Sequence, residues 1–279
     1  MRISGLVGLF VGKPHHPVGA DGRMALSDHL RELRARILKI LIVLVVGLIV
    51  SLFFFEPIFD LVYTPYRTAV ENLPADVNTQ ATSAGVGGPL MLYLKLCGMV
   101  SVVATSPLWL YQIWAFILPG LHRTERKWTR VFVIVAGPLF FCGVLLGYYT
   151  LPKGLELLIG LTPGDLTNLV EFGDYLSFLI RTLLVFGIAF QIPVFVILLN
   201  LAGVLKGSTL GAYRPWIVLG TFVFAAVATP STDPFTMLFL AVPMVVLFAV
   251  SEVIARILDR RRDEADPVAG LADDEMSPL

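Results

Sequence analysis

Long apolar stretches alternate with short polar connections along the chain, and this pattern predicts six membrane-spanning helices. A helix needs about 20 apolar residues to cross the hydrocarbon core of a bilayer, and each stretch reaches or approaches that length. We therefore predict an all-α integral membrane domain over residues 26–260, between a disordered extension (1–25) and a disordered cytoplasmic tail (261–279). Met24 is the expected natural start. The predicted spans cover roughly residues 37–55, 89–118, 131–151, 174–203, 215–229 and 235–255.

The spans differ in length, which predicts a concave bundle rather than a cylinder. The second and fourth spans have about 30 residues, or about 45 Å of helix, so they must tilt or bend. Pro107 and Pro193 lie inside these two spans and are natural kink points. The fifth span has only about 14 apolar residues, or about 21 Å, which favours local thinning of the bilayer. Two long connections, 56–88 and 152–173, are predicted to pack as a structured cap.

Composition supports a membrane protein and offers little chemistry. Apolar residues make up 56% of the chain and charged residues 15%, with mean hydropathy +0.80, whereas a soluble domain has about 25% charged residues. Cys97 and Cys142 lie in apolar stretches, where they act as small hydrophobic residues. The four histidines lack ligand spacing, and the sequence has no nucleotide-binding signature, Ser-His-Asp set or H-E-x-x-H motif. We therefore expect no metal, cofactor, nucleic-acid partner or catalytic residue.

The distribution of Lys and Arg predicts the orientation in the membrane. Seventeen of these 21 residues lie in the N-terminal segment, in the loops after spans two and four, and in the C-terminal segment. The other three connections hold only Arg67 and Lys153. Because cytoplasmic segments carry the excess of Lys and Arg, both termini are predicted to be cytoplasmic, in a multi-pass protein of the inner (plasma) membrane.

Few polar side chains lie inside the spans, and each has a structural and a functional interpretation. Lys95 lies near the outer end of span two. Its ammonium group either extends to the lipid headgroups on the outer side of the membrane or has a functional role. Arg181 lies deep in span four and is expected to face a wet cavity or an acidic partner. Gln112 and Gln191 are neutral. Gln191 adjoins the Pro193 kink, where it either satisfies freed backbone groups or contacts substrate.

Two further patterns predict helix contacts rather than chemistry. Glu252 and Arg256 are four residues apart near the inner end of span six, a spacing that predicts an ion pair on one helix. Gly143 and Gly147 form a G-x-x-x-G pattern in span three, which is typical of close helix packing.

Two short polar motifs lie at the predicted cytoplasmic edge, and each places one glutamate among basic residues. The first, H-L-R-E-L-R-A-R, covers His29–Arg36, and the second, P-G-L-H-R-T-E-R-K, covers Pro119–Lys127. Such glutamates suit a basic peptide, because an arginine guanidinium matches a carboxylate with two parallel hydrogen bonds. The alternative is structural, since Glu32 and Arg36 are spaced for an ion pair on an amphipathic helix, and Glu125 has basic neighbours of its own.

Together these motifs resemble the TatC family, the multispanning subunit of the twin-arginine protein translocase, over about residues 26–260. The N-terminal pattern H-L-x-E-L-R-x-R is joined by the most specific stretch, which covers Ser106–Leu121 and continues to Glu125-Arg126. Further matching segments are Asp174–Phe178, Phe190–Val194, Tyr213–Pro215 and Thr229-Pro230.

The resemblance implies a non-enzymatic core subunit that binds the twin-arginine signal peptides of folded cargo, with export driven by the proton-motive force. The family's two recognition glutamates correspond to Glu32 and Glu125, and the nearby cations of Arg34, Arg126 and Lys127 would hold these carboxylates ionised and in place. The implied partners are single-span TatA-type and TatB-type subunits, which dock on the fifth span, together with further copies of the chain and membrane lipid.

The chain departs from some family members at Gln191, where they carry glutamate. We predict that Gln191 is a neutral hydrogen-bonding group that lines the concavity. One rival interpretation is a small-solute transporter or channel, with Arg181, Gln191 and Lys95 along its path, and another is a membrane scaffold. The densest polar clusters lie at the predicted cytoplasmic face, which favours peptide recognition over a solute path near the midplane.

Overall fold

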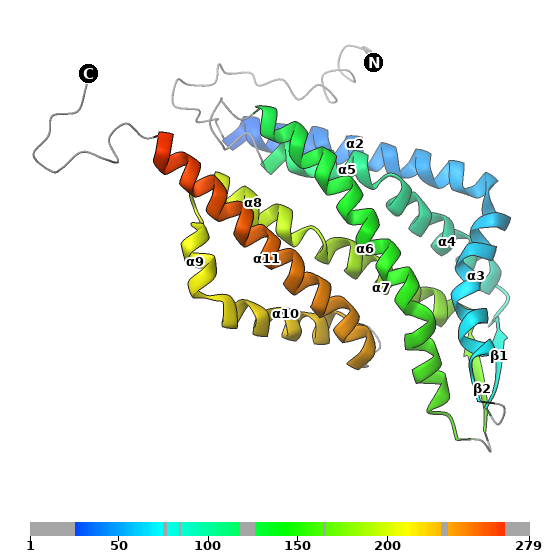
Figure 1. The fold of residues 1–279 in the computed structure, drawn as a ribbon. Helices are drawn as coiled ribbons and strands as arrows, with labels where there is room; N and C mark the ends of the chain where they lie inside the picture. Colours follow the sequence, from blue (N-terminus) through cyan, green and yellow to red (C-terminus); the bar gives the residue numbers. More distant parts are fainter. Residues whose placement is uncertain are drawn as a thin grey trace, which may run out of the picture.

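The structure is a computed structural model that describes residues 26–74, 77–83, 85–117, 126–163, 166–229 and 234–265 (Figure 1). The predicted extension over 1–25 and the tail beyond Ala265 lie outside the described residues. The elements are α2 (Leu26–Phe53), α3 (Phe55–Glu71), β1 (Asn78–Thr82), α4 (Gly88–Ala104), α5 (Ser106–Ile117), α6 (Arg126–Gly160), β2 (Thr167–Glu171), α7 (Phe172–Ala189), α8 (Ile192–Leu201), α9 (Gly207–Ala212), α10 (Arg214–Ala228) and α11 (Pro234–Ala265).

Most of the predicted spans are found as helices that can cross a membrane. Within the described residues, four segments are long and apolar enough, and the bent pair α4 and α5 makes a fifth when it is counted as one span. These five coincide with predicted spans one, two, three, four and six, which confirms a helical membrane protein. α10 coincides with the fifth span but has only 15 residues, so the sixth crossing and the concave shape stay predictions.

Both predicted kink points coincide with a break between helices. α4 and α5 meet at an angle of 58°, and Pro107 is the second residue of α5. Pro193 is likewise the second residue of α8, which follows α7 after a short break. Proline is favoured in the first turn of a helix and disfavours helical geometry in the residue before it, so both breaks lie where the sequence predicts them.

Several helices extend beyond the predicted apolar spans. α2 begins at Leu26 rather than near 37, and α6 continues to Gly160 rather than 151. α11 continues to Ala265, so residues 261–265 are helical although they were assigned to a disordered tail. The discrepancy arises because hydropathy detects only the part of a helix that suits the hydrocarbon core, whereas polar residues continue the same helix outside it.

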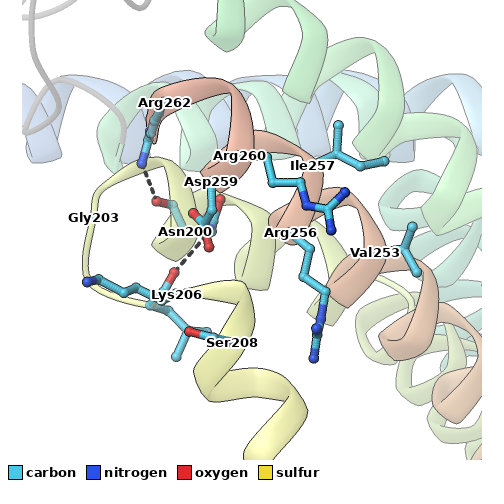
Figure 2. A pocket seen from close by; sticks show the side chains of 11 residues that line it. Asn200, Gly203, Lys206, Ser208, Val253, Arg256, Ile257, Asp259, Arg260 and Arg262 are labelled. Carbon is cyan, nitrogen blue, oxygen red and sulfur yellow. Dashed lines mark hydrogen bonds between the residues drawn. The ribbon is translucent and has the colours of Figure 1, made fainter. Parts of the chain in front are cut away.

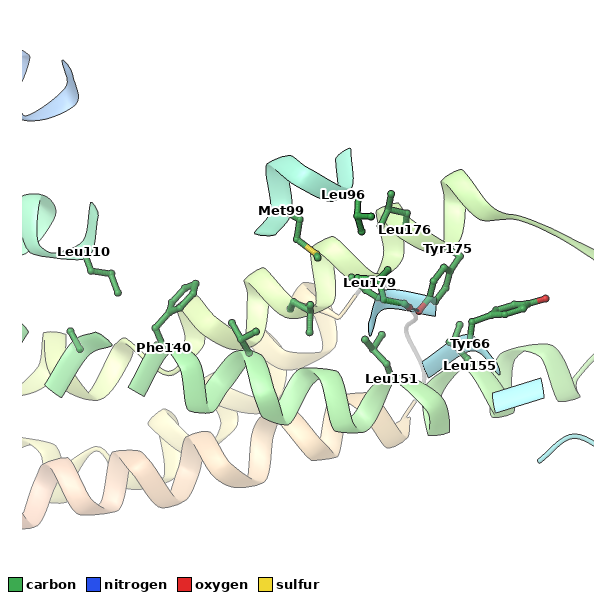
Figure 3. Close-up of a cluster of buried hydrophobic side chains, with 14 of the residues drawn as sticks. Tyr66, Leu96, Met99, Leu110, Phe140, Leu151, Leu155, Tyr175, Leu176 and Leu179 are labelled. Atoms are coloured by element: carbon green, nitrogen blue, oxygen red, sulfur yellow. Dashed lines mark hydrogen bonds between the residues drawn. The ribbon is translucent and has the colours of Figure 1, made fainter. Parts of the chain in front are cut away.

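The core lies along the seam between α6 and α7, and its buried side chains include Phe140 and Leu151 of α6 and Leu176 of α7 (Figure 3). Gly143 lets the two helices approach closely, because a Cβ atom there would lie 2.5 Å from the carbonyl oxygen of Phe186. This contact confirms the packing role predicted for the G-x-x-x-G pattern. In their most apolar parts, 61% of the residues of α7 and α8 are buried inside the protein but only 6% of those of α2, so α2 lies at the outside of the bundle.

The two long connections form a folded cap at the end of the bundle away from the start of α2, as predicted (Figure 1). α3 fills most of the first connection and packs against α6. Two carbonyl oxygens of α3 hold it in place: Leu61 accepts a hydrogen bond from Tyr148 Oη at 2.8 Å, and Val62 accepts one from Tyr175 Oη at 2.5 Å. The cap is therefore tied to the helices that form the core.

A two-stranded parallel sheet joins the two connections and is the one departure from the all-α prediction within the described residues. β1 pairs with β2 in a register that places Asn78 opposite Thr167 and Thr82 opposite Glu171. The sequence does not predict these strands, because each has only five residues and its partner lies three helices away along the chain.

Candidate functional site

Glu32 of the first motif forms an ion pair near the start of α2. Arg36, one helical turn later, donates hydrogen bonds from Nε (2.9 Å) and Nη2 (2.5 Å) to the same carboxylate oxygen, Oε1. The two side chains are 16% and 18% exposed, so the pair is partly buried and still reachable from solvent. Arg36 Nη1 also lies 3.4 Å from Oε1 of Gln112 on α5, which is long for a hydrogen bond. The ion pair expected under the structural alternative is present, and the structure brings Gln112 to it.

Most of the second motif, including Glu125, lies outside the described residues. Arg126 and Lys127 are the first two residues of α6, and their side chains also lie outside the description. α5 ends and α6 begins at the end of the bundle where α2 begins, and Arg34 is exposed there on α2 (Figure 1). The helices that carry the two motifs therefore meet at one end, while the role of Glu125 stays a prediction.

A second glutamate cluster joins α10 to α11. Arg256 Nε donates to Glu252 Oε1 at 2.8 Å, which confirms the predicted pair on one helix. Arg214 adds two hydrogen bonds, from Nε to Oε2 (2.6 Å) and from Nη2 to Oε1 (2.7 Å). The Glu252 side chain is only 3% exposed. Hydrogen bonding to Glu252 and the attraction of its charge raise the pKa of Arg214, so this arginine stays charged.

Sequence reasoning missed Arg214 as a partner of Glu252. The available signal was a basic residue directly before Pro215, at the start of the short span five and at the same predicted membrane face as Glu252. Gly211 makes room for the cluster, because a Cβ atom there would overlap Nη2 of Arg256. The arrangement clamps the short α10 onto α11.

A polar network closes the loop between α8 and α9 onto α11 (Figure 2). Asn200 Nδ2 and the Gly207 N–H donate to the two carboxylate oxygens of Asp259, at 2.8 Å and 2.6 Å. Arg262 donates to the carbonyl oxygens of Asn200 (2.9 Å) and Leu201 (2.6 Å). These carbonyls belong to the last turn of α8, so the cation caps the end of this helix, where the Asn200 carbonyl also accepts the Gly203 N–H at 2.9 Å.

A cavity of about 640 Å³ lies beside this network. Its basic side chains point in different directions in Figure 2, and two of them, Arg256 and Arg262, are held by other protein groups. The basic side chains around the cavity therefore do not converge on a single position where an anion could bind. Within the described residues, no group of three or more His, Cys, Asp or Glu side chains could hold a metal ion.

Of the three polar residues assigned to a path through the membrane, two make hydrogen bonds, each to a different helix. Lys95 Nζ donates to Ser177 Oγ at 3.0 Å and so joins α4 to α7. Arg181 is exposed, and the described residues offer it no hydrogen bond or ion pair. Gln191 Nε2 donates to the carbonyl oxygen of Ala136 at 3.1 Å, which ties the α7–α8 break to α6. Its buried Oε1 has no hydrogen-bond partner among the described residues.

Comparisons with known proteins agree on one family. A sequence model of Sec-independent protein translocase protein (TatC) matches residues 28–243. The protein of that name from Frankia casuarinae is 43% identical over 270 residues, which cover 93% of this chain and 74% of the relative. The Escherichia coli K12 protein is 32% identical over 251 residues, covering 88% of this chain and 95% of the relative. A crystal structure of a twin-arginine translocase receptor, TatC, superposes with a TM-score of 0.67 at 29% identity, covering 81% of this chain and 99% of that one.

Proposed function

Because the chain belongs to the TatC family of Sec-independent protein translocase subunits, we propose that it is the receptor for twin-arginine signal peptides. The family and the apolar helices make it a multi-pass membrane protein and a core subunit of the Tat translocase. The observation that carries the receptor proposal is Glu32, a partly buried carboxylate at the end of the bundle that already binds an arginine side chain.

A signal-peptide arginine would meet Glu32 with the same chemistry that Arg36 now uses. A guanidinium stays charged at physiological pH and presents several donors in one plane, whereas a lysine ammonium offers a single point of charge. Removing one partner of a partly desolvated charge pair costs about 2–5 kcal/mol of binding. Glu32 therefore supports recognition of arginine in preference to lysine.

The second arginine of the signal would bind Glu125, just before the start of α6. α6 begins at the end of the bundle where α2 begins, so we expect both glutamates to serve one peptide at that end (Figure 1). The cations of Arg34, Arg126 and Lys127 would attract the two carboxylates and hold them in place between binding events. Their role is electrostatic and needs no catalytic residue or cofactor.

The same proposal covers orientation and partners. Both termini and both motifs face the cytoplasm of an inner-membrane protein with six crossings, as the excess of Lys and Arg at this end indicates. α10 supports docking of the single-span TatA-type and TatB-type subunits, because one stripe along it exposes large apolar side chains to the membrane: Trp216, Leu219, Val223 and Val227. Further copies of the chain would complete the complex, and the proton-motive force would drive export.

Gln191 would contribute a neutral hydrogen bond along the membrane path of the signal or cargo. Its buried Oε1 has no hydrogen-bond partner among the described residues, so it would accept a hydrogen bond from a passenger once the side chains that cover it move aside. We expect Gln191→Leu to reduce export of a twin-arginine precursor at normal expression of the protein. Export at the wild-type rate would remove Gln191 from the mechanism.

Crosslinking of a twin-arginine precursor to the protein in membranes tests the receptor proposal. Wild type would be compared with Glu32→Ala and Glu125→Ala, and with Glu156→Ala as a matched control, because Glu156 lies at the far end of α6 and pairs only locally with Lys153. Loss of the crosslink in the first two variants alone is the expected result. Retention in both would place recognition elsewhere, and no crosslink to wild type would favour the solute transporter.

A further inference from the structure

We propose that Arg36 is an internal competitor for the recognition carboxylate, which it occupies until a signal-peptide arginine displaces it. This inference rests on the proposed receptor function of Glu32. The structure shows the occupied state, in which Nε and Nη2 of Arg36 both donate to Oε1 of Glu32. A signal arginine needs the same carboxylate, so binding exchanges one guanidinium for another.

The structure also offers Arg36 a second acceptor. Its Nη1 already lies 3.4 Å from Oε1 of Gln112 on α5, a distance that a small rotation of the side chain would shorten. A guanidinium that left Glu32 would therefore form a hydrogen bond to Gln112 and, being 18% exposed, would also reach water. A partly buried cation with no acceptor would be costly, and a hydrogen bond to Gln112 offsets part of that cost.

The placement of both residues on one helix keeps the competition local. Glu32 and Arg36 are one turn apart on α2, and Ala35 between them is 2% exposed, so the helix face is fixed by packing. The exchange then needs a rotamer change in Arg36 and no movement of α2. Rotamer changes of this kind are fast compared with peptide binding.

Competition of this kind weakens every ligand by the same factor. The apparent affinity for a site that is free only part of the time is reduced by the free fraction. If Glu32 is free about one tenth of the time, each peptide loses a factor of about ten, which corresponds to 1.4 kcal/mol. The ratio of the affinities for the arginine and the lysine peptide is unchanged. The affinity for a weakly binding lysine peptide, however, falls further below the value that transport requires.

A different role for Arg36 predicts the opposite result. If Arg36 only positioned Glu32 for the ligand, its removal would leave the carboxylate in a less suitable rotamer and binding would weaken. If Arg36 shaped the choice between arginine and lysine, its removal would change the ratio of the two affinities. Measuring both peptides therefore separates competition from positioning and from selectivity.

The test measures equilibrium binding of two fluorescent signal peptides, one with Arg-Arg and one with Lys-Lys, to the full chain in lipid nanodiscs. The variants are Arg36→Gln, Arg36→Lys and Glu32→Gln. Lys39→Gln is the matched control, because it also removes one positive charge from α2 and Lys39 makes no hydrogen bond or ion pair with the described residues. Thermal unfolding of each variant verifies that it is folded.

We expect Arg36→Gln to bind both peptides about tenfold more tightly with an unchanged ratio, Arg36→Lys to show a smaller gain, and Lys39→Gln to match wild type. Unchanged or weaker binding to Arg36→Gln, a gain for one peptide only, or the same gain in Lys39→Gln would overturn the competition. Glu32→Gln reports on the proposed function separately. It should weaken Arg-Arg binding at least about 30-fold, and wild-type binding there would show that Glu32 is not the receptor carboxylate.

Discussion

The clusters around Glu32 and Glu252 share one sequence pattern but differ in their hydrogen bonds and in their burial. Each glutamate pairs with an arginine four residues later on its own helix, Arg36 on α2 and Arg256 on α11. At Glu32, both hydrogen bonds fall on one carboxylate oxygen and the side chain is 16% exposed. At Glu252, three hydrogen bonds from two arginines use both oxygens, and the side chain is 3% exposed.

The difference comes from a residue on another helix. Arg214, at the start of α10, fills the positions around Glu252 that an incoming ligand would need. The comparable neighbour of Glu32 is the neutral Gln112, which contacts Arg36 rather than the glutamate. A carboxylate that two arginines share is a structural clamp, whereas one held by a single arginine of the described residues can exchange its partner. The clusters should therefore respond differently to matched substitutions.

The largest effect is expected for Glu252→Gln. This change keeps the size of the side chain but removes the charge that two arginines share in a buried position. We expect it to lower the free energy of unfolding by about 2 kcal/mol, or the unfolding midpoint in detergent by about 4–8 °C. Glu32→Gln should lower the free energy of unfolding by less than about 1 kcal/mol, because its pair is partly solvated. Equal losses in the two variants would contradict a structural difference between the clusters.

A smaller loss is expected for Gly211→Ala. The added Cβ would overlap Nη2 of Arg256 and lie 3.0 Å from Oε1 of Glu252, so the Arg256 side chain must move away from the carboxylate. Arg214 keeps its two bonds, and we expect a loss of about 1–2 kcal/mol in thermal unfolding. The matched control is Gly220→Ala in α10, where a Cβ would meet no other atom within 4 Å. That variant should be at least as stable as wild type, because alanine favours a helix over glycine.

Arg214→Lys should lower the stability by less than Gly211→Ala. The substitution loses the paired hydrogen bonds of the guanidinium to both oxygens of Glu252, but it keeps the positive charge. The unfolding midpoint should fall, but by less than in Glu252→Gln. The corresponding change at the other cluster, Arg36→Lys, should leave the midpoint almost unchanged, because Arg36 uses one carboxylate oxygen that a lysine can also reach. A larger fall for Arg36→Lys than for Arg214→Lys would reverse the proposed assignment of clamp and exchangeable pair.

Features that depend on a single helix could be predicted from the sequence. The apolar spans, the breaks next to Pro107 and Pro193, and the pairs at a spacing of four residues all follow from the local rules of helix geometry. The close approach at Gly143 followed from the same kind of pattern, because small residues four apart lie on one face.

Contacts between helices could not be predicted in this way. Arg214 and Glu252 are 38 residues apart, and Arg36 and Gln112 are 76 apart. No periodicity connects such residues, because the contact depends on the tilt and rotation of two separate helices. The same reason explains why the β1–β2 pairing was missed. The sequence therefore identified Glu32 and both pairs within a helix, but it could not show that Arg214 joins Glu252 or that Gln112 lies beside Arg36.

The smallest effect is expected for Gln112→Leu. The 3.4 Å contact of Gln112 with Arg36 is long, and the Glu32–Arg36 pair does not depend on it, so the loss should stay below about 0.5 kcal/mol in thermal unfolding. Asn200→Leu, which changes the contact between α8 and α11, is the informative comparison. Asn200 is 1% exposed, and its Nδ2 donates to Asp259 and to the Leu205 carbonyl, both at 2.8 Å, so its removal should cost several times more. Similar losses in the two variants would mean that the α2–α5 contact is as rigid as the α8–α11 contact, and Arg36 would then have no freedom to move from Glu32 to Gln112.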